Sequence, residues 1–460
     1  MSNFEKEIEI QRTKVFKSAP KVQLISPCKI GNGIIKLSTE EESKYIHYFD
    51  KKNTLVSFFI PASGSGSRMF QFIFDFLSNN KNSEAMNRLL NKLNQFAFFD
   101  NFDEQTKEKI SENKLSKKEI ASLIVDQKGL NLANLPKGLI PFHKKGKQLL
   151  TPFQEQLLQG LDLNNKATFH FTIQEEFKNE IQKNLEELNL KKEQISFSYQ
   201  DKSTNSIAFK QDGEILLSDF KKPFTRPAGH GALIHNLNQI KNEYVFIKNI
   251  DNVQHFEKRH LALKTWKILT GFLMEFKKDA KKVIKAPSLN SLIKLNEKYQ
   301  FSSTESLAKI SSKKEIISHL NRPSRICGMV VNKGLPGGGP FWVKNNKKIS
   351  KQIVEKAQIS EDPDQLKILQ KSSHFNPVLI VASPVDLNGN KIDLQKHIDH
   401  ESYFIVNKKQ EGKAIKYIEL PGLWNGAMSD WNTIFIETPT ESFSPVKSIN
   451  DLLEPPHNAN

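Results

Sequence analysis

Cysteine and tryptophan are scarce in this chain. Its 460 residues include two cysteines and four tryptophans. The cysteines, Cys28 and Cys327, stand in no CxxC or Cys/His spacing. This pattern excludes a disulfide framework and a cysteine-based zinc site. We expect both cysteines to be reduced thiols.

Long apolar runs are also missing. No stretch approaches 18 apolar residues, the length that indicates a membrane-spanning helix. The first ten residues, MSNFEKEIEI, are rich in charge and differ from an apolar targeting segment. We therefore expect a cytoplasmic protein without membrane association.

Positive charge exceeds negative charge, with 67 lysines and arginines against 51 acidic residues and a net charge of +16. The lysines form short pairs spread along the chain, and neither a basic tail nor an RNA-binding motif is present. Binding to nucleic acid is therefore not expected. A solvated lysine-rich surface is the leading interpretation, with a polyanion-binding face and a phosphate-rich small substrate as alternatives.

Short apolar runs alternate with amphipathic stretches, which predicts an α/β fold with a mostly parallel mixed sheet. Strands are expected at 54–60, 166–173, 194–200, 243–250, 325–331, 377–383 and 433–439. Helices are expected at 69–80, 83–97, 105–125, 152–160, 174–188, 255–284 and 289–298. The expected organisation is a peripheral segment 1–45, a catalytic domain 46–450 with helical insertions at about 80–130 and 255–320, and a tail 451–460.

The segment LVSFFIPASGSGSRMF, residues 55–70, predicts a strand that leads through a loop of small residues into a helix. Such a loop lets backbone N–H groups converge on an anion, and the guanidinium of Arg68 matches phosphate oxygens. Phosphates are therefore expected at Ser63, Gly64, Ser65, Gly66 and Ser67. The loop is not a Walker A motif because no GK[ST] closes it, and a structural turn without ligand is the alternative.

Further motifs follow in the chain. They are PKG at 136–138, PAGHGALIHNL at 227–237, YVFIKNIDNV at 244–253, IVEKAQIS at 353–360, HFNPV at 374–378 and FSPVKS at 443–448. In this order they resemble the nucleotidyltransferases, in particular the UDP-sugar pyrophosphorylases of the UDP-N-acetylglucosamine type. With RPSRICGMV, GLPGGGPFWV and ELPGLWNGAMSDWNT, the whole chain looks closer still to a bacterial family of unknown function that is grouped with nucleotidyltransferases.

The resemblance implies a glycosyltransferase-A-like, Rossmann-like fold and a Mg²⁺-dependent reaction. A nucleoside triphosphate, UTP by resemblance alone, would be joined to a sugar 1-phosphate with release of pyrophosphate. It implies catalytic roles for Arg68, Lys137 and Lys447, and a metal ligand in Asp251. It also implies nucleotide binding by Gly229, His230 and Gly231, and sugar binding by Glu355 and Asn376.

The chain departs from the family pattern at three points. Lys137 follows Arg68 by 69 positions, a serine replaces a loop glycine, and no motif supplies a second metal-binding Asp. A glycosyltransferase on the same fold and a non-catalytic nucleotide-sugar-binding protein are therefore alternatives. A turn-capping role for Asp251 and an exposed loop position for His230 also remain open. The sequence does not encode the sugar or the oligomeric state in any motif.

Overall fold

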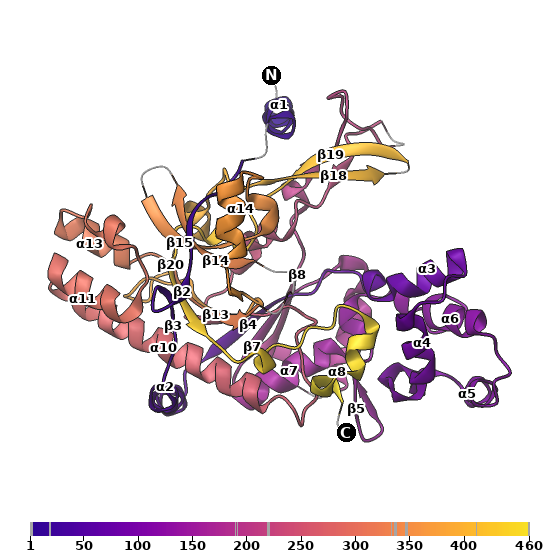
Figure 1. The fold of residues 1–460 in the computed structure, drawn as a ribbon. Coiled ribbons are helices and arrows are strands. Elements are labelled where there is room, and N and C mark those ends of the chain that lie inside the picture. Colours follow the sequence, from indigo (N-terminus) through magenta and orange to yellow (C-terminus); the bar gives the residue numbers. More distant parts are fainter. Residues whose placement is uncertain are drawn as a thin grey trace. The chain divides into compact units, whose positions relative to one another are not determined.

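A computed structural model describes residues 3–17, 20–188, 190, 192–218, 221–332, 334, 338–345, 348–410 and 412–458 (Figure 1). Residues 335–337 of the glycine-rich GLPGGGPFWV stretch lie outside this description. The chain divides into two compact units. Unit 1 comprises 1–57, 199–247 and 267–438, and unit 2 comprises 58–198, 248–266 and 439–460. The domain boundaries expected from the sequence stay a prediction.

All seven predicted strands are present. They are β4 (Val56–Pro61), β7 (Thr168–Thr172), β8 (Ile195–Ser198), β12 (Tyr244–Ile247), β13 (Ser324–Val331), β17 (Ile380–Ser383) and β20 (Asn432–Glu437). In β4, VSFFIP, every residue but the last is buried, which is typical of a strand covered on both faces. Continuous apolar runs thus identified the interior strands.

The main sheet of unit 1 contains strands of both orientations. Its order is β2 (Lys29–Ile30), β3 (Gly33–Ile35), β20, β13, β17 and β12, with β16 (His374–Phe375) beside β13. The pairs β2–β3, β3–β20 and β20–β13 are parallel, whereas β13–β17 and β17–β12 are antiparallel. The α/β class is confirmed as a mixed sheet with many helices. The predicted predominance of parallel pairs stays a prediction.

Smaller sheets of unit 1 come from strands that the sequence analysis did not predict. One sheet joins β1 (Gln23–Pro27), β14 (Gly339–Asn345) and β15 (Lys348–Val354). A second joins β10 (Phe209–Lys210), β19 (Lys413–Glu419) and β18 (Phe404–Gln410), and β9 (Ser206–Ile207) pairs with β11 (Thr225–Arg226). These strands carry many lysines and polar residues, which hides them from an analysis of apolar runs.

The helices of unit 1 include two that cross at close range. They are α1 (Asn3–Phe16), α2 (Thr39–Lys52), α9 (Ile234–Leu237), α10 (His260–Lys285, in unit 1 from residue 267), α11 (Leu289–Tyr299), α12 (Thr304–Leu307), α13 (Lys313–Leu320) and α14 (Pro363–Gln370). A Cβ added to Gly271 of α10 would lie 2.1 Å from the carbonyl oxygen of Tyr45 in α2. The missing side chain therefore lets α2 and α10 pack backbone to backbone (Figure 1).

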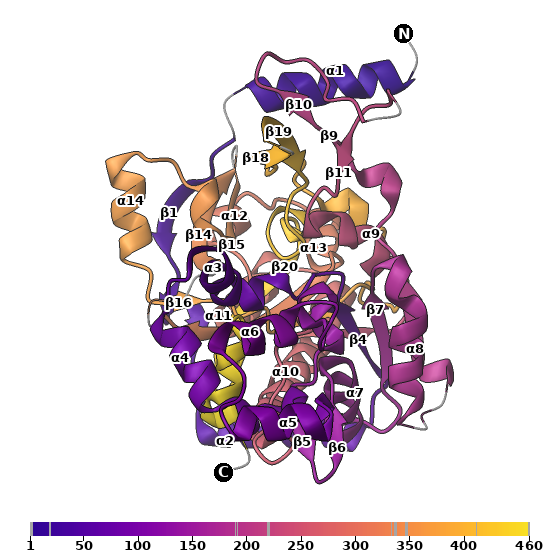
Figure 2. The same ribbon diagram turned by 90° about the vertical axis from the view of Figure 1, so that its right-hand side faces the viewer.

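Unit 2 contains the neighbouring strands β4, β7 and β8, with β7 and β8 parallel. Its other elements are α3 (Gln71–Asn79), α4 (Glu84–Asn91), α5 (Glu104–Ser111), α6 (Lys117–Val125), β5 (His143–Lys145), β6 (Gln148–Leu150), α7 (Pro152–Leu163) and α8 (Lys178–Glu186). Figure 2 shows α3–α6 grouped together and α7 beside α8. Helix α7 starts with a Thr151 capping box and Pro152 in its first turn, both strong helix-start signals.

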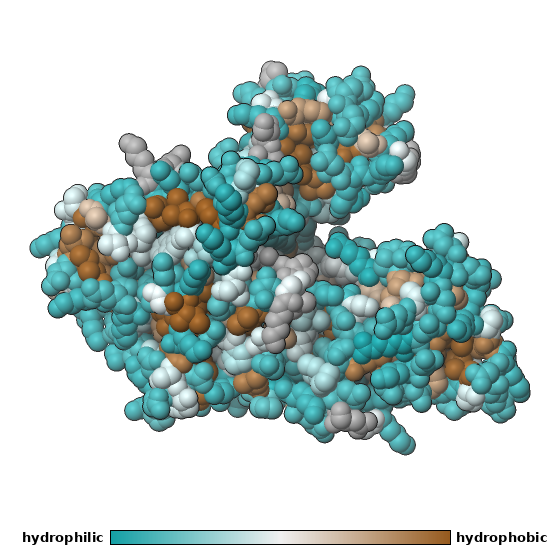
Figure 3. All heavy atoms as spheres, viewed as in Figure 1, coloured by the Kyte–Doolittle hydropathy of each residue, from teal (hydrophilic) through white to brown (hydrophobic). Residues whose placement is uncertain are grey.

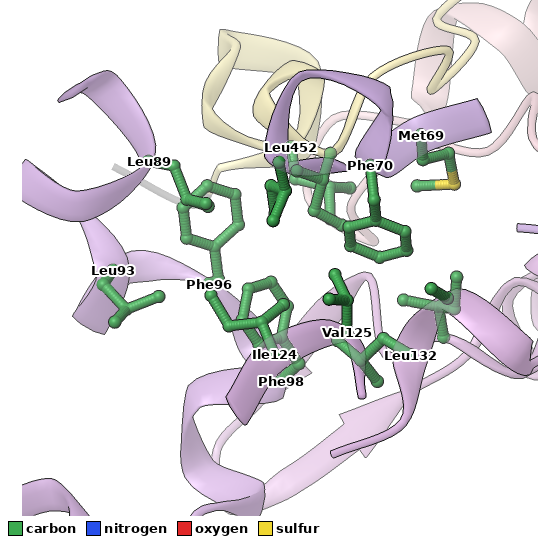
Figure 4. Close-up of a cluster of buried hydrophobic side chains, with 14 of the residues drawn as sticks. Met69, Phe70, Leu89, Leu93, Phe96, Phe98, Ile124, Val125, Leu132 and Leu452 are labelled. Carbon is green, nitrogen blue, oxygen red and sulfur yellow. The ribbon is translucent and has the colours of Figure 1, made fainter. Parts of the chain in front are cut away.

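A cluster of buried hydrophobic side chains within unit 2 holds α3–α6 together (Figure 4). Side chains from these helices, from the short turns that connect them and from the C-terminal segment point toward one another, among them Phe70, Phe96, Phe98, Ile124 and Leu452. The stretch at 80–130, polar in composition, is therefore a folded helical part of unit 2 with a core of its own.

The surface is mainly hydrophilic on the face drawn in Figure 3, where apolar residues form scattered patches. Among the described residues, no helix is both long enough and apolar enough to span a membrane.

The cluster makes a prediction about stability. Phe98 is fully buried and its neighbour Phe99 is only partly buried. We expect Phe98→Ala to lower the free energy of unfolding by about 3–5 kcal/mol, because the substitution removes apolar contacts and leaves a cavity. Phe99→Ala is the matched control and should cost clearly less. Urea unfolding of both variants measures the difference, and equal losses would contradict the packing described here.

Candidate functional site

The loop after β4 begins the candidate site in unit 2. The amide of Ala62 donates to the carbonyl of Thr172 at 2.8 Å, which ends the strand pairing. The chain then runs through exposed Gly64 and Ser65 into a 3-10 helix, Ser67–Phe70, and on into α3. The predicted order of strand, small-residue loop and helix is confirmed.

The PKG segment pairs directly with this loop. Ser65 and Pro136 form an antiparallel bridge, in which Gly66 N donates to Leu135 O at 3.1 Å and Lys137 N to Gly64 O at 3.3 Å. Ser65 occupies the position without hydrogen bonds, so its N–H points away from Pro136. A Cβ on Gly66 would lie 2.7 Å from Ile140 Cδ1 and 3.0 Å from Leu135 O, so glycine allows this close pairing. The 69-residue spacing therefore does not separate the two motifs.

Asp251 joins two of the predicted cations. The Nζ atoms of Lys137 and Lys447 each donate to Asp251 Oδ2 at 2.8 Å, and Lys137 Nζ also donates to the carbonyl of Val446. The other carboxylate oxygen, Oδ1, is buried and has no hydrogen-bond partner among the described residues. Asp251 is therefore an ion-pair centre with one free oxygen.

The backbone around Asp251 is held from two sides. Gln156, fully buried on α7, donates through Nε2 to the carbonyls of Asn249 at 3.0 Å and Ile250 at 3.3 Å. On the other side, Asn252 bridges Pro445, and Val446 N donates to Asp251 O at 3.1 Å. This pairing brings Lys447 to the carboxylate. The sequence analysis missed Gln156, because it is one of three glutamines in the helix PFQEQLLQGLDL and nothing in the sequence distinguishes it from the other two.

Charge and burial shift the pKa values at this centre. Burial alone raises the pKa of Asp251, but the ammonium groups of Lys137 and Lys447 outweigh it, so the pKa lies below its ordinary value. Burial lowers the pKa of Lys137, and Asp251 opposes that shift. The side chain of Lys137 is 13% exposed and that of Lys447 is 62% exposed. Lys137 is thus fixed in place, whereas Lys447 is open to solvent.

A cavity of about 370 Å³ lies at this point, within unit 2. Gly64, Ser65, Arg68, Lys137, Asn249, Asp251 and Lys447 are among its lining residues. Arg68 is exposed and has no ion-pair partner within the part of the chain that the structure describes. Three cations and one carboxylate therefore surround one cavity, an arrangement suited to a multiply charged anion.

The predicted nucleotide-binding residues 229–231 lie in unit 1 and pack on residues 419–424. Gly229 has φ 76° and ψ −176°, a conformation essentially restricted to glycine. A Cβ on Gly231 would lie 2.2 Å from the carbonyl oxygen of Pro421. Both glycines are thus required by the local backbone path.

His230 is partly buried in this segment. Its Nδ1 accepts a hydrogen bond from Leu423 N at 2.9 Å, and its ring stacks on Trp424 with centroids 4.1 Å apart. Burial lowers the pKa of His230 to about 4, so the ring is neutral at pH 7. The interpretation as a freely exposed loop residue does not fit these contacts, and base or ribose binding stays a prediction.

Glu355 approaches the same segment of unit 1. It stands at the start of the 3-10 helix Lys356–Gln358, where its backbone N donates to Gln358 Oε1 at 2.9 Å. Burial raises its pKa, a hydrogen bond from Asn425 opposes the shift, and Glu419 adds to it. Glu419 also lies against Gly229, where an added Cβ would be 3.0 Å from Glu419 Oε2. Glu419 was missed by the sequence analysis, because a single acid at the end of a lysine-rich strand has no distinctive pattern.

The side chain of Asn376 forms hydrogen bonds with backbone groups of unit 1. The buried amide donates through Nδ2 to Gly328 O at 2.8 Å and accepts through Oδ1 from Val378 N at 3.1 Å. Val378 has φ 57°, which is strained for a β-branched residue, and the Asn376 bond supports it. Sugar binding by Asn376 stays a prediction.

The ion-pair centre predicts a pH-dependent contribution to stability. Asp251→Asn should cost about 3–5 kcal/mol of unfolding free energy at pH 7, because it leaves Lys137 buried without a counter-ion. The folded pKa of Asp251 is depressed, so its contribution is present above the unfolded pKa of about 4 and is lost as the pH falls through the folded value. The difference between wild type and variant should therefore shrink in acid.

Asp100→Asn is the matched control. Its pair with Lys144 is solvent-exposed, so this substitution should cost no more than about 1 kcal/mol. Urea unfolding at several pH values measures both variants. Equal losses at pH 7, or a pH-independent difference for Asp251→Asn, would contradict the proposed charge state.

Comparison with known proteins adds two structural likenesses and a family. A protein from Entamoeba histolytica assigned as a UDP-N-acetylglucosamine pyrophosphorylase is similar with a TM-score of 0.47 and 14% identity, over 94% of this chain and 84% of that chain. A UDP-glucose phosphorylase from Trypanosoma brucei is similar with a TM-score of 0.42 and 14% identity, over 94% and 69%. No curated protein matches the chain. Residues 2–458 match the model of the domain of unknown function DUF4301, and the chain therefore belongs to that family.

Proposed function

We propose that the chain is a nucleotidyltransferase that joins a nucleoside triphosphate to a sugar 1-phosphate and releases pyrophosphate. The observation that carries the proposal is the unit 2 cavity, where Arg68, Lys137 and Lys447 surround a loop of glycines and serines. The order of motifs along the sequence supports it independently. UTP is the expected triphosphate, from the resemblance in sequence.

The reaction requires positioning and charge neutralisation more than covalent help from the protein. An oxygen of the sugar 1-phosphate attacks the α-phosphorus of the triphosphate. The bond from that phosphorus to the oxygen bridging to the β-phosphate breaks, and pyrophosphate takes the electron pair. Negative charge builds on the α-phosphate and on the leaving group during this step.

Each cation has a proposed task. Arg68 holds the β- and γ-phosphates, since its guanidinium is not engaged in an ion pair within the described residues and can form two parallel bonds to phosphate. Lys137 is fixed by Asp251 and neutralises charge at the α-phosphate. Lys447 is largely exposed and can turn from Asp251 toward a bound phosphate.

A Mg²⁺ ion fits the residues that are present. Asp251 offers Oδ1, a buried carboxylate oxygen without a hydrogen-bond partner in the described structure. Mg²⁺ in such enzymes takes one or two carboxylates together with phosphate oxygens and water. Clusters of three or more His, Cys, Asp or Glu ligands are not found among the described residues, so substrate phosphates would complete the coordination. The ion would neutralise phosphate charge when bound.

The predicted residues of unit 1 have proposed roles in binding the nucleoside and the sugar. Gly229, His230 and Gly231 would bind the nucleoside, and Glu355 the sugar. Asn376 would contribute to the sugar site by holding its backbone, since its amide bonds to Gly328 O and Val378 N. The neutral ring of His230 keeps Nε2 for a hydrogen bond, and the raised pKa of Glu355 reflects a carboxyl group in a partly desolvated place suited to hydroxyl groups.

Pyrophosphate release tests the proposal. With UTP, Mg²⁺ and a panel of sugar 1-phosphates, the wild-type chain should release pyrophosphate. Arg68→Ala should lower the rate about 100-fold or more, because it removes a charge-stabilising group from the transition state. Arg88→Ala is the matched control, since Arg88 pairs with Glu454 on the surface and should leave the rate unchanged.

The alternatives give different results. Release of a free nucleoside diphosphate from a nucleotide sugar, without pyrophosphate formation, would replace the proposal with a glycosyltransferase. Thermal stabilisation by nucleotide sugars with no turnover under any condition would replace it with a binding protein. Equal loss of activity in Arg68→Ala and Arg88→Ala would refute the task given to Arg68.

A further inference from the structure

A second basic cavity lies in unit 1, formed by α2 and α10. Its volume is about 830 Å³, within the range of small-molecule sites. Seven lysines line it, against one carboxylate, Glu243. We name it the lysine cavity; two of its lysines come from α2 and five from α10.

The geometry of the two helices explains the hollow. They touch where Gly271 of α10 meets Tyr45 of α2. Beyond this crossing, Lys51 and Lys52 at the end of α2 line one side of the cavity, while the last turns of α10 line the other. Tyr244, Met274 and Leu387 add less polar surface.

The lysines of the two helices converge. The Nζ atoms of Lys52 and Lys278 lie 5.9 and 5.8 Å from the centre of the same ring, that of Tyr48. Along α10, Lys277, Lys281 and Lys285 follow at four-residue intervals, so each is displaced by about 6 Å along one side of the helix. Positive groups therefore face one space from two sides and extend along it.

Most of this charge is uncompensated within the described residues. Lys277 is buried and pairs with Glu243 at 2.9 Å, and Lys282 pairs with Asp279 at 3.0 Å. The other five lysines of the cavity have no ion-pair partner in the described part of the chain. Like charges at four-residue spacing on a helix repel one another, so this arrangement has a cost unless an anion neutralises it.

Two ordinary explanations cover part of the pattern. Lysines in the last turn of a helix complement its dipole, which accounts for Lys51, Lys52, Lys282 and Lys285. A lysine-rich composition explains scattered exposed lysines. Neither explains Lys281 and Lys278, which precede the last turn of α10 and line the same concave space as the lysines of α2.

We infer that the lysine cavity binds a small molecule carrying a chain of several phosphate groups. A row of lysines matches a linear polyanion better than a single carboxylate or orthophosphate. The concave shape favours a small ligand over a lipid bilayer, which presents a broad surface. This site uses none of the residues of the unit 2 cavity and does not depend on the proposed reaction.

Inorganic tripolyphosphate is a suitable probe, measured by calorimetry on the full chain. The Arg68→Ala/Lys447→Ala background removes two cations of the unit 2 cavity and isolates the second site. Tripolyphosphate should bind this background protein roughly 10-fold more tightly than orthophosphate, and the affinity should fall as salt is raised.

Lys278→Gln/Lys281→Gln/Lys285→Gln, made in this background, should weaken binding about 10-fold or more. The matched control, Lys294→Gln/Lys313→Gln/Lys314→Gln, removes the same charge from exposed positions of α11 and α13 and should retain binding. Unfolding midpoints of both variants confirm that they are folded. The result that overturns the inference is equal weakening in the two triple variants, or no weakening in either.

Competition identifies the source of the phosphate chain. If a nucleoside triphosphate displaces bound tripolyphosphate at a lower concentration than added tripolyphosphate does, the result supports a nucleotide as ligand. If added tripolyphosphate is effective at the lower concentration, the result supports an inorganic polyphosphate. Binding of single-stranded RNA or of anionic phosphatidylserine vesicles through the same three lysines, without binding of tripolyphosphate, would overturn the inference in favour of a macromolecular partner.

Discussion

The carboxylate of Asp251 holds together segments that are far apart in the chain. Its Oδ2 accepts hydrogen bonds from Lys137, 114 residues before it, and from Lys447, 196 residues after it. Each partner needs the other, because a buried carboxylate is unfavourable without cations and a buried ammonium is unfavourable without an anion. The geometry of the candidate site and the stability of unit 2 therefore depend on the same contact. A substrate phosphate that drew Lys447 away would leave Lys137 to keep Asp251 ionised.

The surroundings of this ion pair are polar but rigid. Helix α7 directs buried glutamines inward, and Gln156 and Gln159 bond to backbone carbonyls of the segment 249–254. Side chains that are buried and hydrogen-bonded lose little further freedom when a ligand binds, so a site built on them is preorganised. The exposed groups, Arg68 and Lys447, are the ones left to adapt to a substrate. This division between fixed and adaptable cations would suit the proposed reaction, which depends on positioning.

Lysine has different physical roles in the two basic cavities. In unit 2, Lys137 is buried against a carboxylate, and its position is set by that pair. In unit 1, Lys277 is likewise buried and paired with a carboxylate, but most of the other lysines of its cavity are exposed. A net charge of +16 spread evenly over the surface would carry little information. The packing of α10 against α2 concentrates part of this positive charge in the lysine cavity. The sequence analysis described the lysines as spread along the chain and did not predict this concentration.

Much of the fold could be predicted from local patterns. The interior strands are continuous apolar runs, and the order of strand, small-residue loop and helix after β4 follows from the sequence. Strands such as β18 and β19 were missed because FIVNKKQ and KAIKYIE carry lysines on exposed positions and show no continuous apolar run. Ordered motifs pointed to Arg68, Lys137, Asp251 and Lys447, because a motif is defined by residue type and by order along the chain. Neither property requires knowledge of distances in space.

The sequence by itself thus determined which segments become interior strands, and it singled out charged residues that the structure brings around one cavity. Only the tertiary structure decided that Lys137 and Lys447 donate hydrogen bonds to the same oxygen of Asp251. It likewise decided that the amide of Asn376 forms hydrogen bonds with the backbone of Gly328 and Val378. It also decided that the lysines of α2 and α10 line the same cavity. The physical reason is that local propensity acts over a few neighbouring residues, whereas these contacts join positions that only chain folding brings within hydrogen-bonding or electrostatic range.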